Sequence, residues 1–146
     1  MASTALGDIP GARFHAPVVG THASVASNGA AARLGQIGPF AHNIRMRNIW
    51  HSPTGADQGA NTASYRRLSV YNGGTAGTVT ATASRIASLN YSASLASLGA
   101  RALTVDTTVT LASGEIAYFS QETVGGDDAT GTVLRAGQFS VAYEVI

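Results

Sequence analysis

Cysteine and lysine are both absent from this chain of 146 residues, and few of its side chains carry charge. Without cysteine there can be no disulfide, thiolate metal site or cysteine nucleophile. Only 12% of the residues are charged and the net charge is +1, whereas an average domain is about 25% charged. A nucleic-acid-binding protein normally carries a basic stripe, so this composition argues against a nucleic-acid partner.

Long apolar runs are missing as well. No stretch reaches the roughly 18 apolar residues of a membrane-spanning helix, so no membrane partner is expected. The opening stretch MASTALGDIPGARFHAP lacks the charged and apolar regions of a secretory signal, and its glycines and prolines disfavour a helix. We therefore expect an extended N-terminal arm over residues 1–20. The rest, residues 21–146, has the length of one domain.

Short segments with period-two alternation dominate what is present. This alternation predicts strands that bury one face. The segments cover residues 40–52, 64–72, 78–89, 101–111, 114–124 and 137–146. Glycine-rich turns such as YNGGTAG (71–77) and ASGE (112–115) separate them. Many short strands with regular turns predict an all-β fold, an antiparallel β-sandwich of jelly-roll-like type.

The alternation also assigns side chains to faces. In FAHNIRMRNIWHS it puts Ile44, Met46 and Trp50 on one face and Arg45 and Arg47 on the other. The two arginines of that strand should therefore lie on the same face.

Two further strands have clear faces. In SYRRLSVYN the neighbours Arg66 and Arg67 fall on opposite faces, with Leu68 and Val70 on the side of Arg66. In GQFSVAYEVI four apolar residues are expected inward and three small or charged residues outward. The inward set is Phe139, Val141, Tyr143 and Val145, and the outward set is Ser140, Ala142 and Glu144.

Motifs for chemistry are scarce. The four histidines lack the spacing of metal ligands, no nucleophile elbow or phosphate-binding loop occurs, and no metal or other cofactor is expected. One hydrolase arrangement stays open, because Glu115, Glu122 and Glu144 would converge if their strands paired. The expectation is a protein without enzymatic activity.

Arginine is the one marked feature, since it supplies all nine basic residues. Its planar fork makes fixed bidentate contacts with carboxylates better than lysine does, and arginine and tryptophan are enriched in binding hot spots. Interface candidates in the body of the chain are Arg45, Arg47, Trp50 and Arg66. Those in the predicted arm are Ile9, Pro10, Arg13 and Phe14.

Three runs carry a resemblance to a known group of proteins. SYRRLSVYNGGTAGTVTATASRIASLN, LTVDTTVTLASGEIAYFSQETVGGD and GTVLRAGQFSVAYEVI together resemble the small β-sandwich capsid decoration, or cement, proteins of tailed bacteriophages. The likeness covers roughly residues 40–146. It implies a non-enzymatic virion protein on the outer surface of an icosahedral head, bound to the major capsid protein and commonly trimeric. No functional residue is transferred by it.

Two other functions are compatible with the same pattern. One is a different phage structural role, as a tail or head-fibre component. The other is a carbohydrate-binding β-sandwich, in which Trp50, Tyr65, Tyr71 and Tyr118 would stack on sugar rings, although aromatic residues make up only 7% of the chain.

Overall fold

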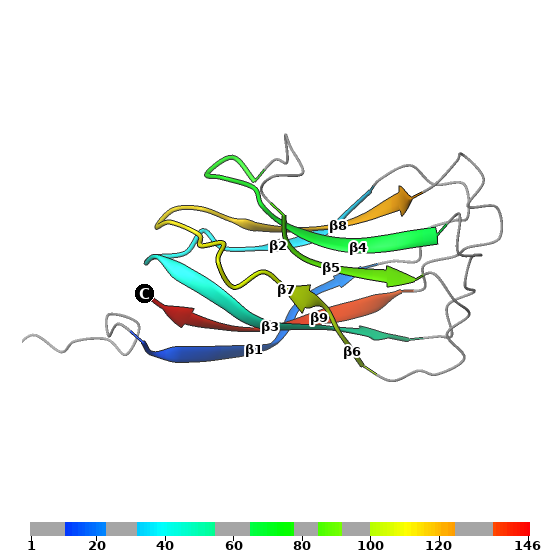
Figure 1. Ribbon diagram of the computed structural model, residues 1–146, viewed down its shortest axis with the longest axis horizontal. Coiled ribbons are helices and arrows are strands. Elements are labelled where there is room, and N and C mark those ends of the chain that lie inside the picture. Colours follow the sequence, from blue (N-terminus) through cyan, green and yellow to red (C-terminus); the bar gives the residue numbers. More distant parts are fainter. Residues whose placement is uncertain (1–10, 23–31, 55–64, 78–84, 92–99, 125–135) are drawn as a thin grey trace, which may run out of the picture.

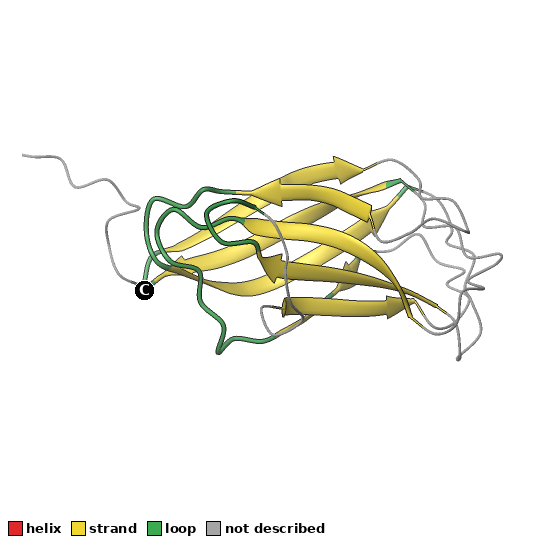
Figure 2. Cartoon of the chain, turned by 90° about the horizontal axis from the view of Figure 1, so that it is seen from above, coloured by secondary structure: helices red, strands yellow, loops and turns green. Residues whose placement is uncertain are grey.

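The protein is a sandwich of two antiparallel sheets in a computed structural model that describes residues 11–22, 32–54, 65–77, 85–91, 100–124 and 136–146 (Figures 1 and 2). No helix occurs within these ranges, and so none that could cross a bilayer. The strands are β1 (Arg13–His22), β2 (Ala32–Ile37), β3 (Ile44–Pro53), β4 (Tyr65–Asn72), β5 (Arg85–Tyr91), β6 (Arg101–Ala102), β7 (Thr104–Val105), β8 (Ala117–Val124) and β9 (Gly137–Val145).

The strand order is that of a jelly roll. One sheet has the order β1-β9-β3-β6 and the other β2-β8-β4-β5-β7. The first strand thus pairs with the last, and the second strand pairs with the last but one. This is the strand pairing of a jelly roll. This confirms the predicted fold class.

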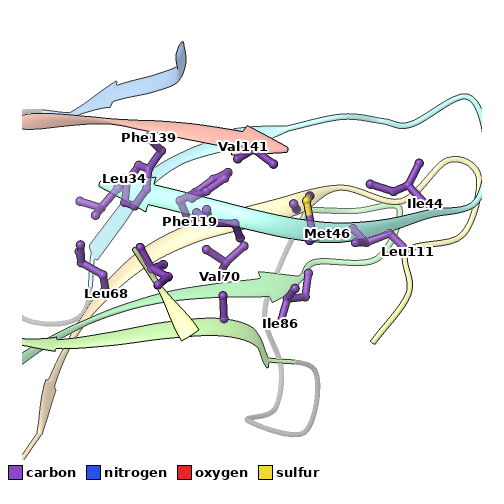
Figure 3. Close-up of a cluster of buried hydrophobic side chains, with 14 of the residues drawn as sticks. Leu34, Ile44, Met46, Leu68, Val70, Ile86, Leu111, Phe119, Phe139 and Val141 are labelled. Carbon is purple, nitrogen blue, oxygen red and sulfur yellow. The ribbon is translucent and has the colours of Figure 1, made fainter. Parts of the chain in front are cut away.

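The interior is made by the alternating apolar residues of both sheets (Figure 3). Phe119 of β8 and Phe139 of β9 meet across the two sheets with ring centroids 4.7 Å apart. Among the described residues, twelve core side chains are at most 1% exposed, and they come from strands of both layers and from one connecting segment. They are Ile44, Met46, Ile49, Leu68, Val70, Ile86, Tyr91, Leu111, Ala117, Phe119, Phe139 and Val141.

The N-terminal boundary differs from the prediction. Arg13–His22 forms β1 and pairs with β9, so residues 13–20 belong to the sheet and the expected boundary falls inside a strand. Pro17 does not end this strand, because the ladder is irregular between Ala16 and Gly20 and β1 is an edge strand, where proline is tolerated. Residues 1–10 lie outside the described residues.

The segment 101–111 also differs from the single strand expected of it. Arg101–Ala102 pairs with β3 and Thr104–Val105 pairs with β5, so the chain passes from one sheet to the other. A turn then follows, in which the carboxylate of Asp106 accepts hydrogen bonds from the backbone N (2.9 Å) and the hydroxyl (2.6 Å) of Thr108. This local bonding competes with strand pairing.

Candidate interaction surface on the outer face of the β1–β9–β3 sheet

Cross-strand register brings two arginines to one glutamate. β9 lies between β1 and β3, and Glu144 of β9 is directly opposite Arg13 on one side and Arg45 on the other. Directly opposed residues project from the same face of a sheet. Because the neighbouring Tyr143 and Val145 point inward, this is the outer face of the sandwich.

A bulge in β3 adds a third arginine. The β3–β9 register shifts between Met46 and Asn48 and leaves Arg47 without a partner residue on β9. Arg47 donates a hydrogen bond through its terminal nitrogen to Glu144 Oε1. The prediction that Arg45 and Arg47 share a face is therefore confirmed, and the bulge aims the second arginine at the same carboxylate as the first.

The carboxylate lies beneath the guanidinium groups. Glu144 Oε1 is 3.6 Å from the Arg45 terminal nitrogen, and Oε2 is 3.8 Å from Arg13 Nε. The Glu144 side chain is 9% exposed, whereas those of Arg45, Arg47 and Arg13 are 33%, 34% and 78% exposed. Three positive charges against one negative charge leave an excess of two positive charges at the surface.

The electrostatics of the cluster follow from this arrangement. The hydrogen bond from Arg47, and then the charges of Arg47, Arg45 and Arg13, hold the pKa of Glu144 below its ordinary value. Within the described part of the chain, the buried Nε atoms of Arg45 and Arg47 have no hydrogen-bond partner. Glu144 does not use these two donors, and their burial also closes them to a partner at the surface.

Small side chains continue this face along β9, away from the arginines. Ser140 and Ala142 project outward and are half-buried, and Trp50 of β3 lies directly opposite Ser140. Small residues let a partner's surface approach the sheet closely, and a half-exposed tryptophan is a favourable anchor. We name this surface the arginine face: Arg13, Arg45, Arg47, Trp50, Ser140, Ala142 and Glu144.

The position of Trp50 corrects the prediction made from strict alternation. Trp50 was expected on the face of Ile44 and Met46, but the bulge after Met46 shifts the register by one residue. A one-residue shift exchanges the two faces of a strand. Trp50 therefore shares the outer face with the arginines.

Arg66 is a second correction, because the structure buries it. Its side chain points between the sheets with Leu68 and Val70, is 0% exposed, and donates a hydrogen bond of 2.6 Å to Gln121 Oε1. Burial lowers the pKa of Arg66. The expected opposite orientation of Arg66 and Arg67 is confirmed, but Arg66 is not a surface residue and cannot contact a partner directly.

The four arm candidates divide into three groups. Arg13 is part of the arginine face. Phe14 points the other way, toward the interior, where its ring stacks on Tyr143 at 5.5 Å. Ile9 and Pro10 lie outside the described residues.

Sequence reasoning missed a second network, on the outer face of the other sheet. Glu122 of β8 accepts hydrogen bonds from Arg67 Nε (2.8 Å), from the Ser69 hydroxyl (3.1 Å) and from the Tyr71 hydroxyl. Burial raises the pKa of Glu122, but the hydrogen bonds from Tyr71 and Arg67 outweigh it and hold the pKa below its ordinary value. Burial, and then the bond to Glu122, raises the pKa of Tyr71. Here three side chains bind the same carboxylate.

The geometry bears on the two arrangements left open by the sequence. Glu122 and Glu144 lie on outer faces of different sheets, and Glu115 sits in a turn, bound by Asn72 and the backbone N of Ala112 at 2.7 Å each. The three glutamates therefore do not converge. Among the described residues, no group of three or more histidine or acidic side chains could hold a metal ion.

The four aromatic residues suggested for sugar stacking do not form one platform. Trp50 lies on the sheet that contains β3, whereas Tyr65, Tyr71 and Tyr118 lie on the other sheet. Tyr71 is only 2% exposed, and the guanidinium of Arg33 lies over the ring of Tyr118 at 4.9 Å.

No protein-family model and no curated protein sequence matches the chain. Among solved structures, a chain from "Structure of infectious bursal disease virus Gx strain" aligns over 91% of the present chain, with a TM-score of 0.40 and 11% sequence identity. The alignment covers 32% of that viral chain, so the present chain spans about a third of its length.

Proposed function

We propose that this chain is a non-enzymatic structural protein of a virion, which decorates an icosahedral phage capsid and docks on the outer surface of the major capsid protein lattice through the arginine face. The observation that carries the proposal is the cluster of three arginines around one glutamate. A fold alone does not assign a function, although jelly rolls recur in viral capsid domains. The sequence resemblance supplies the capsid as the partner.

The chemistry of the face fits an acidic partner. A carboxylate from a neighbouring protein would meet the exposed guanidinium groups of Arg13, Arg45 and Arg47, where bidentate hydrogen bonds are strong. The small side chains of Ser140 and Ala142 would let the two surfaces come into contact. An interface of about 800 Å² on each partner is typical of a stable complex, and a lattice repeats the same contact at many positions.

Mixing purified chain with undecorated capsids of the phage that encodes it tests the proposal. The double variant R45E/R47E should weaken co-sedimentation by about 2 kcal/mol or more, roughly 30-fold, because charge reversal places like charges against the partner. R33E is the matched control, since Arg33 is exposed on the other sheet and its reversal should leave binding unchanged. Equal binding of all three proteins would exclude the arginine face.

Cryo-electron microscopy of decorated particles then tests the location and the stoichiometry. We expect density for the chain on the outer surface at three-fold or quasi-three-fold positions, as a homotrimer, with the β1–β9–β3 sheet toward the capsid. Density at the tail or in a head fibre would instead identify another structural role. The absence of the chain from purified particles would reject a virion role altogether.

A further inference from the structure

An apolar notch lies where β1 begins and β9 ends, at the same end of the sandwich (Figure 1). It has a volume of about 210 Å³, and its lining comes from β1, β3, β9 and the loop between β2 and β3. The lining residues are Phe14, Phe40, Ala41, His42, Ile44, Tyr143 and Val145. All are apolar or aromatic except His42, which is half-buried. A cavity of about 150 Å³ binds one benzene ring, so the notch has room for one large apolar side chain.

The walls of the notch are held in place by ring contacts and backbone hydrogen bonds. The ring of Tyr143 stacks on Phe14 at 5.5 Å and meets the edge of Phe40 at 5.4 Å. Phe40 N donates to Glu115 O (3.1 Å), and Phe40 O accepts from Gly114 N (2.7 Å). Phe14 and Tyr143 are nevertheless only partly buried. An apolar occupant is therefore favoured, because it removes exposed ring surface from water.

The notch wall and the arginine cluster alternate along the same three strands. Their neighbouring members are Arg13 and Phe14 of β1, Arg45 and Ile44 of β3, and Glu144 and Tyr143 of β9. Successive side chains of a strand project to opposite faces, so the charged members lie just around the end of the sandwich from the notch. β1 is an edge strand, and the side chain of Arg13 is 78% exposed. A partner segment that passes around this edge can reach both sites with a few extended residues, each of which spans about 3.3–3.6 Å.

We propose that the notch and the arginine cluster together bind one segment of an acidic partner protein. An aromatic or large aliphatic side chain of that segment fills the notch, and a carboxylate close to it pairs with Arg13 or Arg45. This inference rests on the proposed function and specifies the chemistry of its partner. The excess of two positive charges beside the notch favours an acidic segment. It disfavours a second copy, because a two-fold contact at this end would bring two such clusters together.

Titration of the isolated, isotope-labelled chain with 3-phenylpropionate tests the chemistry of the site by NMR. This probe joins one ring to one carboxylate, and it should produce saturable shifts of the backbone amides of Phe14, His42 and Val145. The matched alcohol 3-phenylpropanol lacks the charge and should bind about five-fold more weakly, as expected for the loss of one exposed ion pair. A41Q places a larger, neutral and polar side chain at the exposed rim of the notch and should abolish the shifts. T104Q, at an exposed position on the other sheet, should not.

Co-sedimentation of the same variants with undecorated capsids tests the partner. A41Q should weaken capsid binding about ten-fold or more, because it keeps one large apolar side chain of the partner from being buried. T104Q should bind like the unaltered chain. R45E/R47E should also weaken binding, as the proposed function requires.

Each other outcome overturns the inference, and the variants separate it from the proposed function. If A41Q binds capsids normally and R45E/R47E does not, the arginine face stands and the notch is not part of the interface. If neither variant weakens binding, both proposals fail. An absence of shifts with 3-phenylpropionate would show that the notch does not accept such a ligand, and shifts that survive A41Q would place the probe elsewhere. If the same amides shift when the chain alone is concentrated, the occupant is a second copy.

Discussion

Replacing Glu122 with glutamine probes the hydrogen-bond network that joins β4 to β8. The substitution keeps the size of the side chain and removes its charge. Arg67, Ser69 and Tyr71 all donate to this carboxylate, and the side chains of Glu122 and Arg67 are only 18% and 24% exposed. The network is therefore screened less by water than a surface ion pair.

The expected cost follows from the change in bond type. Hydrogen bonds to charged groups contribute about 1.5–3 kcal/mol each, and neutral ones about 0.5–1.5 kcal/mol. Three bonds each lose about 1 kcal/mol, and an amide cannot accept from all three donors as well as a carboxylate. We expect E122Q to lower the free energy of unfolding by about 2–3 kcal/mol, or the melting temperature by about 4–12 °C for a chain of this length.

Urea unfolding at several pH values measures this cost and its origin. The folded-state pKa of Glu122 is depressed, so its contribution is complete above the unfolded value of about 4.3 and is lost as the pH falls through the folded value. The difference between E122Q and the original protein should be constant from about pH 7 to pH 5 and should shrink at lower pH. D106N is the comparison, because within the described residues the Asp106 carboxylate is bound only by Thr108 in an exposed turn, and it should lower the free energy of unfolding by less than E122Q does. A difference that is small at neutral pH, or independent of pH, would refute the role of the charge.

Two further substitutions test backbone and core. G38A should lower the free energy of unfolding by about 1–3 kcal/mol. Gly38 has φ +112°, and an added Cβ would lie 2.9 Å from Glu115 O. An unchanged melting temperature would contradict this prediction. Y91F should lower the free energy of unfolding by about 1–2 kcal/mol, because it removes the hydroxyl that lies 2.6 Å from the buried Nδ1 of His51. If urea unfolds Y91F at the same concentration as the unaltered chain, this hydrogen bond adds nothing to stability.

The strands that the sequence predicted well are those whose inward side chains alternate along the chain. In β9 the inward set Phe139, Val141, Tyr143 and Val145 is as expected, and in β4 Arg66, Leu68 and Val70 share the inner face. One buried face and one outer face leave a period-two signal that needs no knowledge of the partner strand.

The strands that the sequence missed are those where local signals oppose pairing. β1 contains Pro17 and β2 contains Gly35, residues that disfavour a strand when read alone, and both ladders are irregular near these positions. Their pairing with β9 and β8 depends on contacts 80 or more residues away in the chain. Local propensity cannot report contacts of that range.

The candidate surface was predictable only in part, for the same reason. Arg45 and Arg47 share a strand, so alternation alone places them together. Glu144 and Arg13 join them through register with distant strands, and Trp50 joins them through a bulge. Alternation places Arg66 on the apolar face of Leu68 and Val70, but it does not show the buried partner, Gln121 of β8, that lets an arginine lie there.

The two outward-facing glutamates of the sandwich indicate which face is available to a partner. Glu122 accepts hydrogen bonds from three side chains of its own chain, one of them an arginine, so these bonds stabilise the fold. Glu144 is shared by three arginines, of which only Arg47 is hydrogen-bonded to it in the described part of the chain. The arginine side chains are 33–78% exposed, so a carboxylate from outside could bind them and would also offset the two excess positive charges. A partner that docks on the arginine face therefore completes an interaction that the chain leaves incomplete, whereas one that docks over Glu122 would have to break bonds already made.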